Sequence, residues 1–272
     1  MLLEAEISLV GDEHVGSVVG LIPSQGVMLK SGNRVSPNTL QTEIARHWDS
    51  FWDLRLKSPM PRVLFRVGDI VEGRHHDSPL SWGTPLDQLE CAEGLYAPMM
   101  SAFQHWFSVN GTPVHVGEEG CADEALAVRL GFSEIGGRRS VAQARVSIAG
   151  TLFDVAHEGP RAGKLVWAIG NSLRNFARNI VMLDILSGRT PPRVIVRAHG
   201  HRKCHEYLDV DGVKVDAFLI PSWKARDDFG HKVSNYLHIA DVGGLVIRVR
   251  EGEIINWWFD CLEFSDVGEV SV

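Results

Sequence analysis

Short apolar runs alternate with polar segments along this chain, and the spacing of the apolar residues indicates which runs are strands. Three runs near the N-terminus have strand length, at Leu3–Val10, Arg62–Val67 and Trp106–Val109. Between the first two, apolar residues recur at helical spacing up to Leu56. Ser36-Pro37 has the residue types that open a helix, so a helix is predicted from there. Strands and helices are therefore expected to alternate in this part of the chain.

Further helices and hairpins follow from the same pattern. Helices are expected at Leu86–Gln104, at Glu118–Leu130 and at Leu165–Leu186, and an irregular loop at Gly16–Pro37. Ala144–Ile148 and Leu152–Val155 are predicted to form a hairpin. From Val194 onward the pattern predicts antiparallel strands, with turns at Asp211-Gly212, Gly243-Gly244 and Glu251-Gly252. Without an internal repeat or a linker, the chain is expected to form one domain over residues 1–272.

Residue types that commonly bind metals follow five of the apolar runs. The segments GDEH, GDIVEG, NGTPVH, AHEG and AHGH supply Asp12, His14, Asp69, Asn110, His115, His157, His199 and His201. In open α/β sheets the carboxyl ends of the strands converge on one crevice, so these side chains are expected to meet there. Taken singly, each segment has a structural explanation, such as a polar loop, a helix-capping Asp or a structural His. Five in series favour a two-metal hydrolytic site.

Composition and charge narrow the class of protein. Hydrophobic residues make up 44% of the 272 residues and charged residues 22%, which is typical of a globular protein. The formal net charge of −7 argues against a clamp that binds nucleic acid through a basic surface. It does not exclude a nuclease, because bound divalent ions supply local positive charge.

Cysteine spacing and the apolar segments bear on the compartment. The four cysteines show no CxxC spacing, so a disulfide framework or a zinc ribbon is not expected. The N-terminal segment carries acidic residues where a signal peptide carries basic ones. No stretch approaches the roughly 18 apolar residues of a membrane span. A cytoplasmic location without a membrane partner is therefore expected.

The order of the five segments resembles that of the calcineurin-like metallophosphoesterases. In that superfamily the motifs are Asp-x-His, Gly-Asp, Gly-Asn-His-Asp/Glu, a strand-end His and Gly-His-x-His. The resemblance covers roughly residues 3–249 and looks closest to the phage-type branch through GDIVEGRHH, GTPVHVG and VRAHGHR. It implies a four-layer α/β/β/α sandwich with mixed sheets. It also implies two divalent metal ions, with Mn²⁺ favoured and Fe or Zn²⁺ as alternatives.

The resemblance also implies how the ions are held. Asp12, His14, Asp69 and His201 would hold the first ion, and the second would share Asp69 and take His157 and His199. Two ions about 4 Å apart bridge a hydroxide and polarise a phosphoryl oxygen, so Asp69 would be part of the catalytic centre.

One segment departs from the superfamily pattern. In NGTPVH, Thr112 occupies the place of the metal-binding Asn, Pro113 replaces the His, and His115 lies two residues further on. In one interpretation Asn110 or Thr112 supplies the missing oxygen ligand and His115 is the general acid. In the other, fewer protein ligands and more water hold the second ion. The first is preferred, and a structural role for His115 is the remaining alternative.

Candidate substrate contacts flank the proposed ligands. His76, close to Glu72, follows Asp69, whereas Arg161 and Arg202 follow His157 and His201. They are predicted to contact a phosphate group, with solvated loop charges as the alternative.

The favoured function is hydrolysis of a phosphoester by two metal ions, more specifically a phosphodiester. A DNA nuclease is the second candidate, with nucleic acid as its substrate. A protein of another class, which binds a partner on a degenerate phosphoesterase fold, is the third. The oligomeric state does not follow from the sequence.

Overall fold

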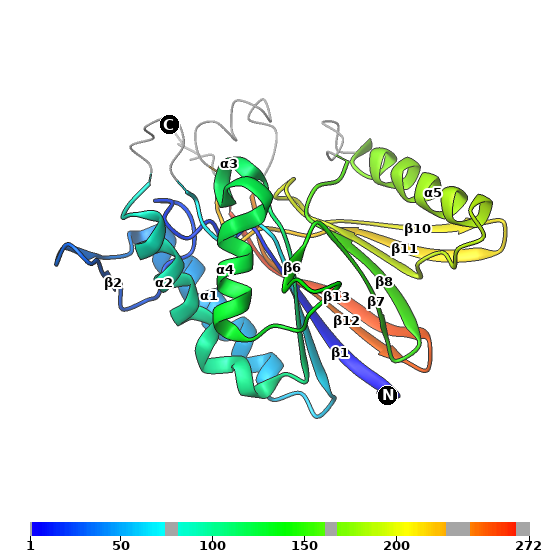
Figure 1. Cartoon of the computed structure of the whole chain (residues 1–272), viewed down its shortest axis with the longest axis horizontal. Helices are drawn as coiled ribbons and strands as arrows, with labels where there is room; N and C mark the ends of the chain where they lie inside the picture. The colour runs from blue at the N-terminus through cyan, green and yellow to red at the C-terminus, as the bar shows by residue number, and fades with distance from the viewer. Residues whose placement is uncertain (1, 74–80, 161–167, 227–239, 265–272) are drawn as a thin grey trace, which may run out of the picture.

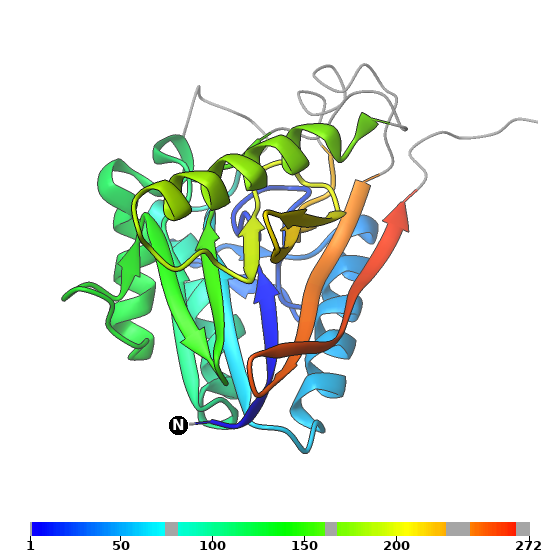
Figure 2. The ribbon, with the colours of Figure 1, turned by 90° about the vertical axis from the view of Figure 1, so that its right-hand side faces the viewer.

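The computed structural model describes residues 2–73, 81–160, 168–226 and 240–264. Two β-sheets pack face to face, and helices cover their outer faces (Figure 1). The strands of the first sheet are β1 (Glu4–Val10), β4 (Arg62–Val67), β5 (His105–Val109), β6 (Ser140–Val141), β12 (Ala240–Arg250) and β13 (Glu253–Phe264). Their order is β13-β12-β1-β4-β5-β6. Figure 2 shows β1 in blue between β4 and β12, parallel to the former and antiparallel to the latter.

The second sheet is built from the middle of the chain. Its strands are β7 (Gln143–Ile148), β8 (Thr151–Ala156), β9 (Val194–Arg197), β10 (Cys204–Val210) and β11 (Val213–Leu219). Their order is β10-β11-β9-β8-β7, with β9 parallel to both neighbours and the outer pairs antiparallel. A separate small hairpin pairs β2 (Val27–Met28) with β3 (Arg34–Val35), inside the segment predicted to be an irregular loop.

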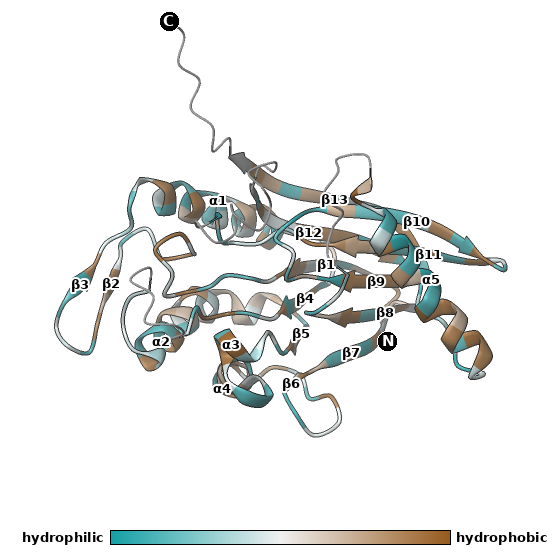
Figure 3. Ribbon diagram, turned by 90° about the horizontal axis from the view of Figure 1, so that it is seen from above, coloured by the Kyte–Doolittle hydropathy of each residue, from teal (hydrophilic) through white to brown (hydrophobic). Residues whose placement is uncertain are grey.

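Helices lie on both sides of the paired sheets. They are α1 (Thr39–Leu56), α2 (Pro85–Tyr96), α3 (Pro113–Val116), α4 (Cys121–Leu130) and α5 (Asn171–Leu186), with 3₁₀ turns η1 (Ala97–Ala102) and η2 (Glu118–Gly120). Figure 3, seen from above, places α1, α2 and α4 to one side of the sheets and α5 to the other. Within the described residues, no helix combines the length and the apolar character that crossing a bilayer requires.

Three apolar cores hold these layers together. Alternate residues of the inner strands, such as Ile7 and Phe65, pack against the second sheet through Phe153 and Val196. Trp48 and other large side chains fill the space between the first sheet and its helices. A third core joins α5 to the second sheet. The predicted α/β class and the mixed sheets are therefore confirmed, and the period-two pattern of the strands is the reason.

Most predicted elements are present, with corrections at helix ends. The helices predicted from Glu118 and from Leu165 begin at Cys121 and Asn171, and the 3₁₀ turn η2 precedes the former. The helix predicted from Ser36-Pro37 begins at Thr39, because Asn38 and Gln41 exchange hydrogen bonds in a reciprocal cap. The helix predicted to reach Gln104 ends at Tyr96, and a 3₁₀ turn that contains Pro98 follows it.

The turn predicted at Gly243-Gly244 is wrong, because both glycines lie inside β12. A Cβ atom on Gly243 would lie 2.0 Å from the carbonyl oxygen of Asp260 on β13, and one on Gly244 would lie 2.9 Å from the ring of Phe51. The glycines therefore allow close packing of the strand pair and of α1. The turns at Asp211-Gly212 and Glu251-Gly252 are confirmed.

Candidate metal centre

The proposed ligands lie at the carboxyl ends of neighbouring parallel strands. Asp12 and His14 follow β1, and Asp69 follows β4, its parallel neighbour. His157 follows β8, and the loop with His199 and His201 follows its parallel neighbour β9. Because the two sheets are stacked, the loops after these four strands meet above the core.

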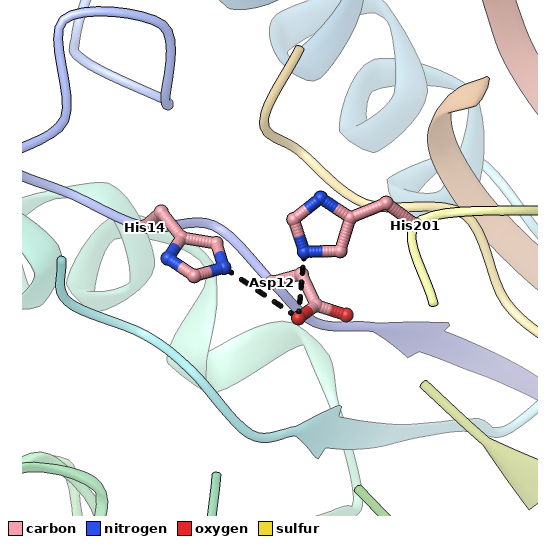
Figure 4. A group of neighbouring side chains, drawn as sticks. All are labelled: Asp12, His14 and His201. Atoms are coloured by element: carbon pink, nitrogen blue, oxygen red, sulfur yellow. Dashed lines mark ion pairs between the residues drawn. The ribbon is translucent and has the colours of Figure 1, made fainter. Parts of the chain in front are cut away.

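The carboxylate of Asp12 lies at the middle of this cluster. Its Oδ1 atom is 3.3 Å from Nε2 of His201, 3.6 Å from Nε2 of His14 and 3.9 Å from Nε2 of His157. Figure 4 shows the imidazoles of His14 and His201 on two sides of this carboxylate. Two ligand atoms that each lie about 2.1 Å from one ion are about 3 to 3.5 Å apart, so the shorter of these spacings suit shared metal ligation.

Among the described residues, three overlapping groups of side chains are close enough to hold a cation. In each group the ligand atoms lie within 4.8 Å of one another. The groups are Asp12 with His14 and His201, Asp69 with His157 and His199, and His14 with Asp69 and His115. The first contains three of the four ligands implied for the first ion, without Asp69, and the second has the three implied for the second ion. The third adds His115 to the candidate ligands.

Several buried atoms in the cluster are left without hydrogen bonds. Oδ1 of Asp12, Nε2 of His14 and Nε2 of His157 have no hydrogen-bond partner among the described residues. A buried polar atom without a partner is costly, and cations held in the two ligand groups that contain these residues would satisfy all three atoms. The donor set of oxygen and imidazole nitrogen fits a divalent transition metal. The residues therefore fit the ions that the sequence implies.

Backbone conformation is also unusual at the proposed ligands. Asp12, His14, Asp69, His199 and His201 have positive φ angles between 45° and 64°. Residues other than glycine rarely adopt this left-handed conformation, because it costs conformational free energy. Such strained residues cluster at functional sites.

His157 is oriented by its second ring nitrogen. Nδ1 donates to the carbonyl oxygen of Val67 at 2.7 Å, so Nε2 faces the carboxylates and lies 3.1 Å from Oδ2 of Asp69. Burial alone would lower the pKa of His157, but the charges of Asp69 and Asp12 outweigh it and raise the pKa to about 10. In the absence of metal, protonated His157 therefore neutralises the buried carboxylates.

This pKa makes the stability of the metal-free protein depend on pH. Because the pKa of His157 is raised to about 10 from the ordinary value near 6.5, its contribution is complete below about pH 6.5 and is lost as the pH rises towards 10. We expect the Tm of the metal-free protein to fall by several degrees between pH 6.5 and 9, since each kcal/mol shifts Tm by about 2–4 °C. Circular dichroism melts test this. Bound metal should flatten the profile, and His157→Gln should make it shallower, because His14, whose pKa is raised to about 9, still contributes. A flat metal-free profile would refute the expectation.

His14 is held by a buried ion pair behind the cluster. Its Nδ1 lies 2.9 Å from Glu72, whose carboxylate also accepts from the ammonium of Lys224 at 3.1 Å. Burial and the charge of Lys224 lower the pKa of His14, but Asp12 and Glu72 outweigh them and raise it to about 9. Glu72 thus orients a proposed ligand. Lys224 was not identified from the sequence.

Thr112 contacts Asp69 directly. Its backbone N–H donates to Oδ1 of Asp69 at 2.6 Å, and its hydroxyl lies 3.0 and 3.1 Å from the two carboxylate oxygens. Thr112 can come this close to Asp69 only because the residue before it is glycine. A Cβ atom on Gly111 would lie 2.1 Å from Oδ1 of Asp69. The structure thus shows Thr112 as a donor that orients a ligand, and its predicted role as a ligand stays a prediction.

The hydroxyl of Thr112 is expected to matter for metal affinity. Thr112→Val removes one of two donors to Asp69 at nearly constant volume, and loss of such an orienting bond typically weakens metal binding about 10- to 100-fold. Thr112→Ser keeps the hydroxyl and is the matched control. Mn²⁺ titration by calorimetry measures both. Equal affinities of the two variants would show that the hydroxyl does not orient Asp69.

The other residues of this loop have separate contacts. Asn110 donates to the carbonyl oxygen of Glu119 at 3.2 Å, and its side chain lies against Gly120. Nδ1 of His115 lies 2.9 Å from the carbonyl oxygen of Glu72, and its ring meets that of His14 edge to face at 4.4 Å. Because a carbonyl only accepts, Nδ1 of His115 carries a proton. Burial and the charge of His14 lower the pKa of His115 to about 4.

A fully buried ionic cluster lies behind the ligand loops. Arg66 donates to Asp123 and, at 2.9 Å, to Ser108, and it lies 3.9 Å from Glu13. Asp123 also accepts from the N–H of Gly111, at 2.6 Å. The cluster therefore connects the loops that carry Asp12, Asp69 and Thr112. An Arg inside an apolar strand is the sequence signal that indicates a buried partner, but its identity cannot be read from the pattern.

Two predicted substrate contacts, His76 and Arg161, lie outside the described residues. Arg202 is half-buried next to His201. Its contact with substrate stays a prediction, as does that of the other two.

Comparisons with known proteins assign no family. No family model matches the chain, and no curated protein matches it. Among solved structures, a Thermotoga maritima protein solved by NMR is 12% identical over 95% of this chain and 99% of its own, with a TM-score of 0.35. A hypothetical protein from Thermus thermophilus is 10% identical over 95% and 99%, with a TM-score of 0.41.

The chain is also similar to the sulfate thiohydrolase SoxB of Thermus thermophilus, solved with glycerol. The identity is 10% over 95% of this chain and 56% of the SoxB chain, with a TM-score of 0.42. All three likenesses are too distant to transfer an activity.

Proposed function

We propose that this chain is a metal-dependent phosphoester hydrolase of the calcineurin-like type, with phosphodiesters as the favoured substrates. The observation that carries the proposal is the convergence of Asp12, Asp69 and their imidazole partners into two adjoining ligand groups. The unpartnered buried atoms in these groups support resident cations. The order of ligands along the chain, from the strand end of β1 to that of β9, supports the same type of enzyme.

In this proposal Asp12, His14, Asp69 and His201 hold one ion, and Asp69, His157 and His199 hold the other. Mn²⁺ is the favoured metal, with Fe or Zn²⁺ as alternatives, because thiolates are absent from the ligand groups found among the described residues. When bound, such ions lower the pKa of water and offset the charge that develops on a phosphoryl group. Asn110 and Thr112 remain proposed as additional oxygen ligands.

His115 is proposed to protonate the leaving oxygen. A pKa of about 4 keeps its ring neutral at pH 7 in the metal-free protein, so it does not donate a proton there. A bound phosphoester brings negative charge next to the ring, which favours the protonated form. The bond to the carbonyl of Glu72 holds Nδ1, so the transferred proton would reside on Nε2. Arg202, Arg161 and His76 are the proposed contacts for the other phosphate oxygens.

A panel of substrates in the presence of Mn²⁺ tests the function. The panel contains an aromatic phosphodiester, the matching phosphomonoester, and single- and double-stranded DNA. We expect the diester to be hydrolysed fastest, with no turnover after chelation. Preferential cleavage of DNA would favour the nuclease. Metal binding without turnover of any substrate would favour a binding protein on a phosphoesterase fold.

The role of His115 is tested with diesters whose leaving groups differ in pKa. His115→Ala should reduce turnover most for the poorest leaving group, by about 10²- to 10⁴-fold, because a general acid matters most there. Equal losses for good and poor leaving groups would remove His115 from the acid role. Such a result would agree with the third ligand group, in which His115 joins His14 and Asp69.

A further inference from the structure

A second pocket lies outside the metal centre, among α1, α2, η1 and the loop that follows the first ligand segment. Its volume is about 330 Å³, which is in the range of small-molecule sites. Its buried wall consists of Leu21, Ile22, Trp48, Trp52, Leu95 and Met99. None of the proposed metal ligands lines it. We infer that this pocket binds a small organic amine with an apolar body, independently of the proposed function.

The wall of the pocket is aromatic. Trp48 and Trp52 lie one turn apart on α1, and their rings meet edge to face at 5.3 Å. Trp rings are the aromatic groups that attract cations most strongly.

The rim of the pocket is negative. Asp49 and Asp53, each next to one of the two tryptophans, lie one turn apart on α1 and are exposed. Ser24 donates to Asp49 at 3.2 Å, but within the described residues no Lys, Arg or His forms an ion pair with either carboxylate. Like charges at this spacing repel each other on a helix, so a cation placed between them is stabilised. The rim therefore selects a positively charged occupant.

A glycine keeps the pocket open. Gly94 lines it from the interior of α2, where glycine is among the least favourable residues. The φ angle of Gly94 is not in the left-handed range, and a Cβ atom there would meet nothing within 4 Å. Neither backbone conformation nor crowding requires glycine at this position. The missing side chain instead leaves space that an occupant can fill.

Three small molecules that share one skeleton and differ in charge test whether the pocket prefers a positively charged ligand. Tyramine, tyrosol and 4-hydroxyphenylacetate share a phenol and differ only in an amine, an alcohol or a carboxylate. They are titrated into the full chain, and the indole N–H signals of Trp48 and Trp52 are followed by NMR. We expect tyramine to shift these signals and to bind about 3- to 30-fold more tightly than tyrosol, the range of a cation–aromatic contact. The carboxylate should bind most weakly.

Substitutions at the rim and in the wall test whether the two ligands bind in this pocket. Asp49→Asn/Asp53→Asn should reduce the preference for tyramine over tyrosol, because the rim carboxylates are lost, and should leave the affinity for tyrosol unchanged. Glu251→Gln/Glu253→Gln, on the β12–β13 turn, makes the same change in net charge and should alter neither. Gly94→Leu fills the pocket and should weaken both ligands at least about tenfold, as expected when a small ligand loses its apolar cavity. Its melting temperature should stay at or above that of the wild type, which separates blocking from unfolding.

Three results would overturn the inference. The first is equal affinity for tyramine and tyrosol in the wild type. The second is a loss of tyramine binding in the Glu251→Gln/Glu253→Gln control that equals the loss in the Asp49→Asn/Asp53→Asn variant. The third is binding of a lysine-containing peptide, but not of tyramine, which would identify a protein partner as the occupant.

Discussion

Asp69→Asn is expected to lower turnover by about 10³-fold or more, because the lost charge stabilisation amounts to several kcal/mol and each 1.36 kcal/mol is a factor of ten. Oδ2 of Asp69 lies 3.1 Å from Nε2 of His157 and 3.9 Å from Nε2 of His14, so this carboxylate adjoins imidazoles from two ligand groups. Burial would raise the pKa of Asp69, but the charges of His157 and His14 outweigh it and hold the pKa well below its ordinary value. In the proposed centre, a neutral amide would lack the charge with which Asp69 would help to hold both ions.

Metal content measured by mass spectrometry, together with turnover, checks this result. Asp216→Asn is the matched control, because Asp216 is also a buried carboxylate but accepts from His205 and Arg193 away from the ligand groups. The control should keep the metal content of the wild type. If Asp69→Asn also keeps both metal content and turnover, Asp69 is not a shared ligand.

Arg66→Met is expected to have the largest effect on stability, with a loss of about 3–5 kcal/mol in the free energy of unfolding. The guanidinium of Arg66 is completely buried, and it is the cation that adjoins both Asp123 and Glu13. Burial raises the pKa of Glu13 to about 7 even though the charge of Arg66 opposes that shift. Without Arg66, Asp123 would be left as a buried charge or would have to take up a proton.

Urea denaturation at pH 7 measures this loss. Arg189→Met is the matched control, because the side chain of Arg189 is 61% exposed and its partner Asp184 keeps Arg145 as a second partner. The expected loss is therefore below about 1 kcal/mol. Arg66→Met/Asp123→Leu should recover part of the loss, since it removes the unpaired charge. Equal losses for Arg66→Met and Arg189→Met would show that the buried cluster does not stabilise the fold.

Much of the fold follows from the local pattern of the sequence. The strand at Arg62–Val67 has the predicted bounds, and the hairpin with Ala149-Gly150 at its turn is present. The strand depends on a short, nearly continuous apolar run, and the hairpin depends on period-two alternation and on glycine at a positive φ angle. All of these are local properties. The gathering of Asp12, Asp69 and His157 was also expected, because parallel strands deliver their ends to one edge of a sheet.

Features that depend on distant contacts were not predictable in the same way. Gly243 resembles a turn residue, and only the proximity of Asp260 shows why glycine is required within a strand. Lys224 acquires its role by pairing with Glu72, which lies far away in the sequence. Thr112 resembled a replacement ligand, whereas the structure shows it donating to Asp69. Local patterns identify side chains with the right chemistry, but tertiary packing decides which atoms they contact.

The position of β1 between β4 and β12 affects how the protein is made. The strand that leads to Asp12 pairs on one side with residues near position 65 and on the other with residues near position 245. During synthesis, the side of β1 that faces β12 stays without its partner until residues near position 250 have left the ribosome. Folding that depends on such distant pairing is slow, and the uncovered strand edge can associate with other nascent polypeptides. The sheet that carries Asp12 and Asp69 is therefore expected to be completed only after β12 has been made.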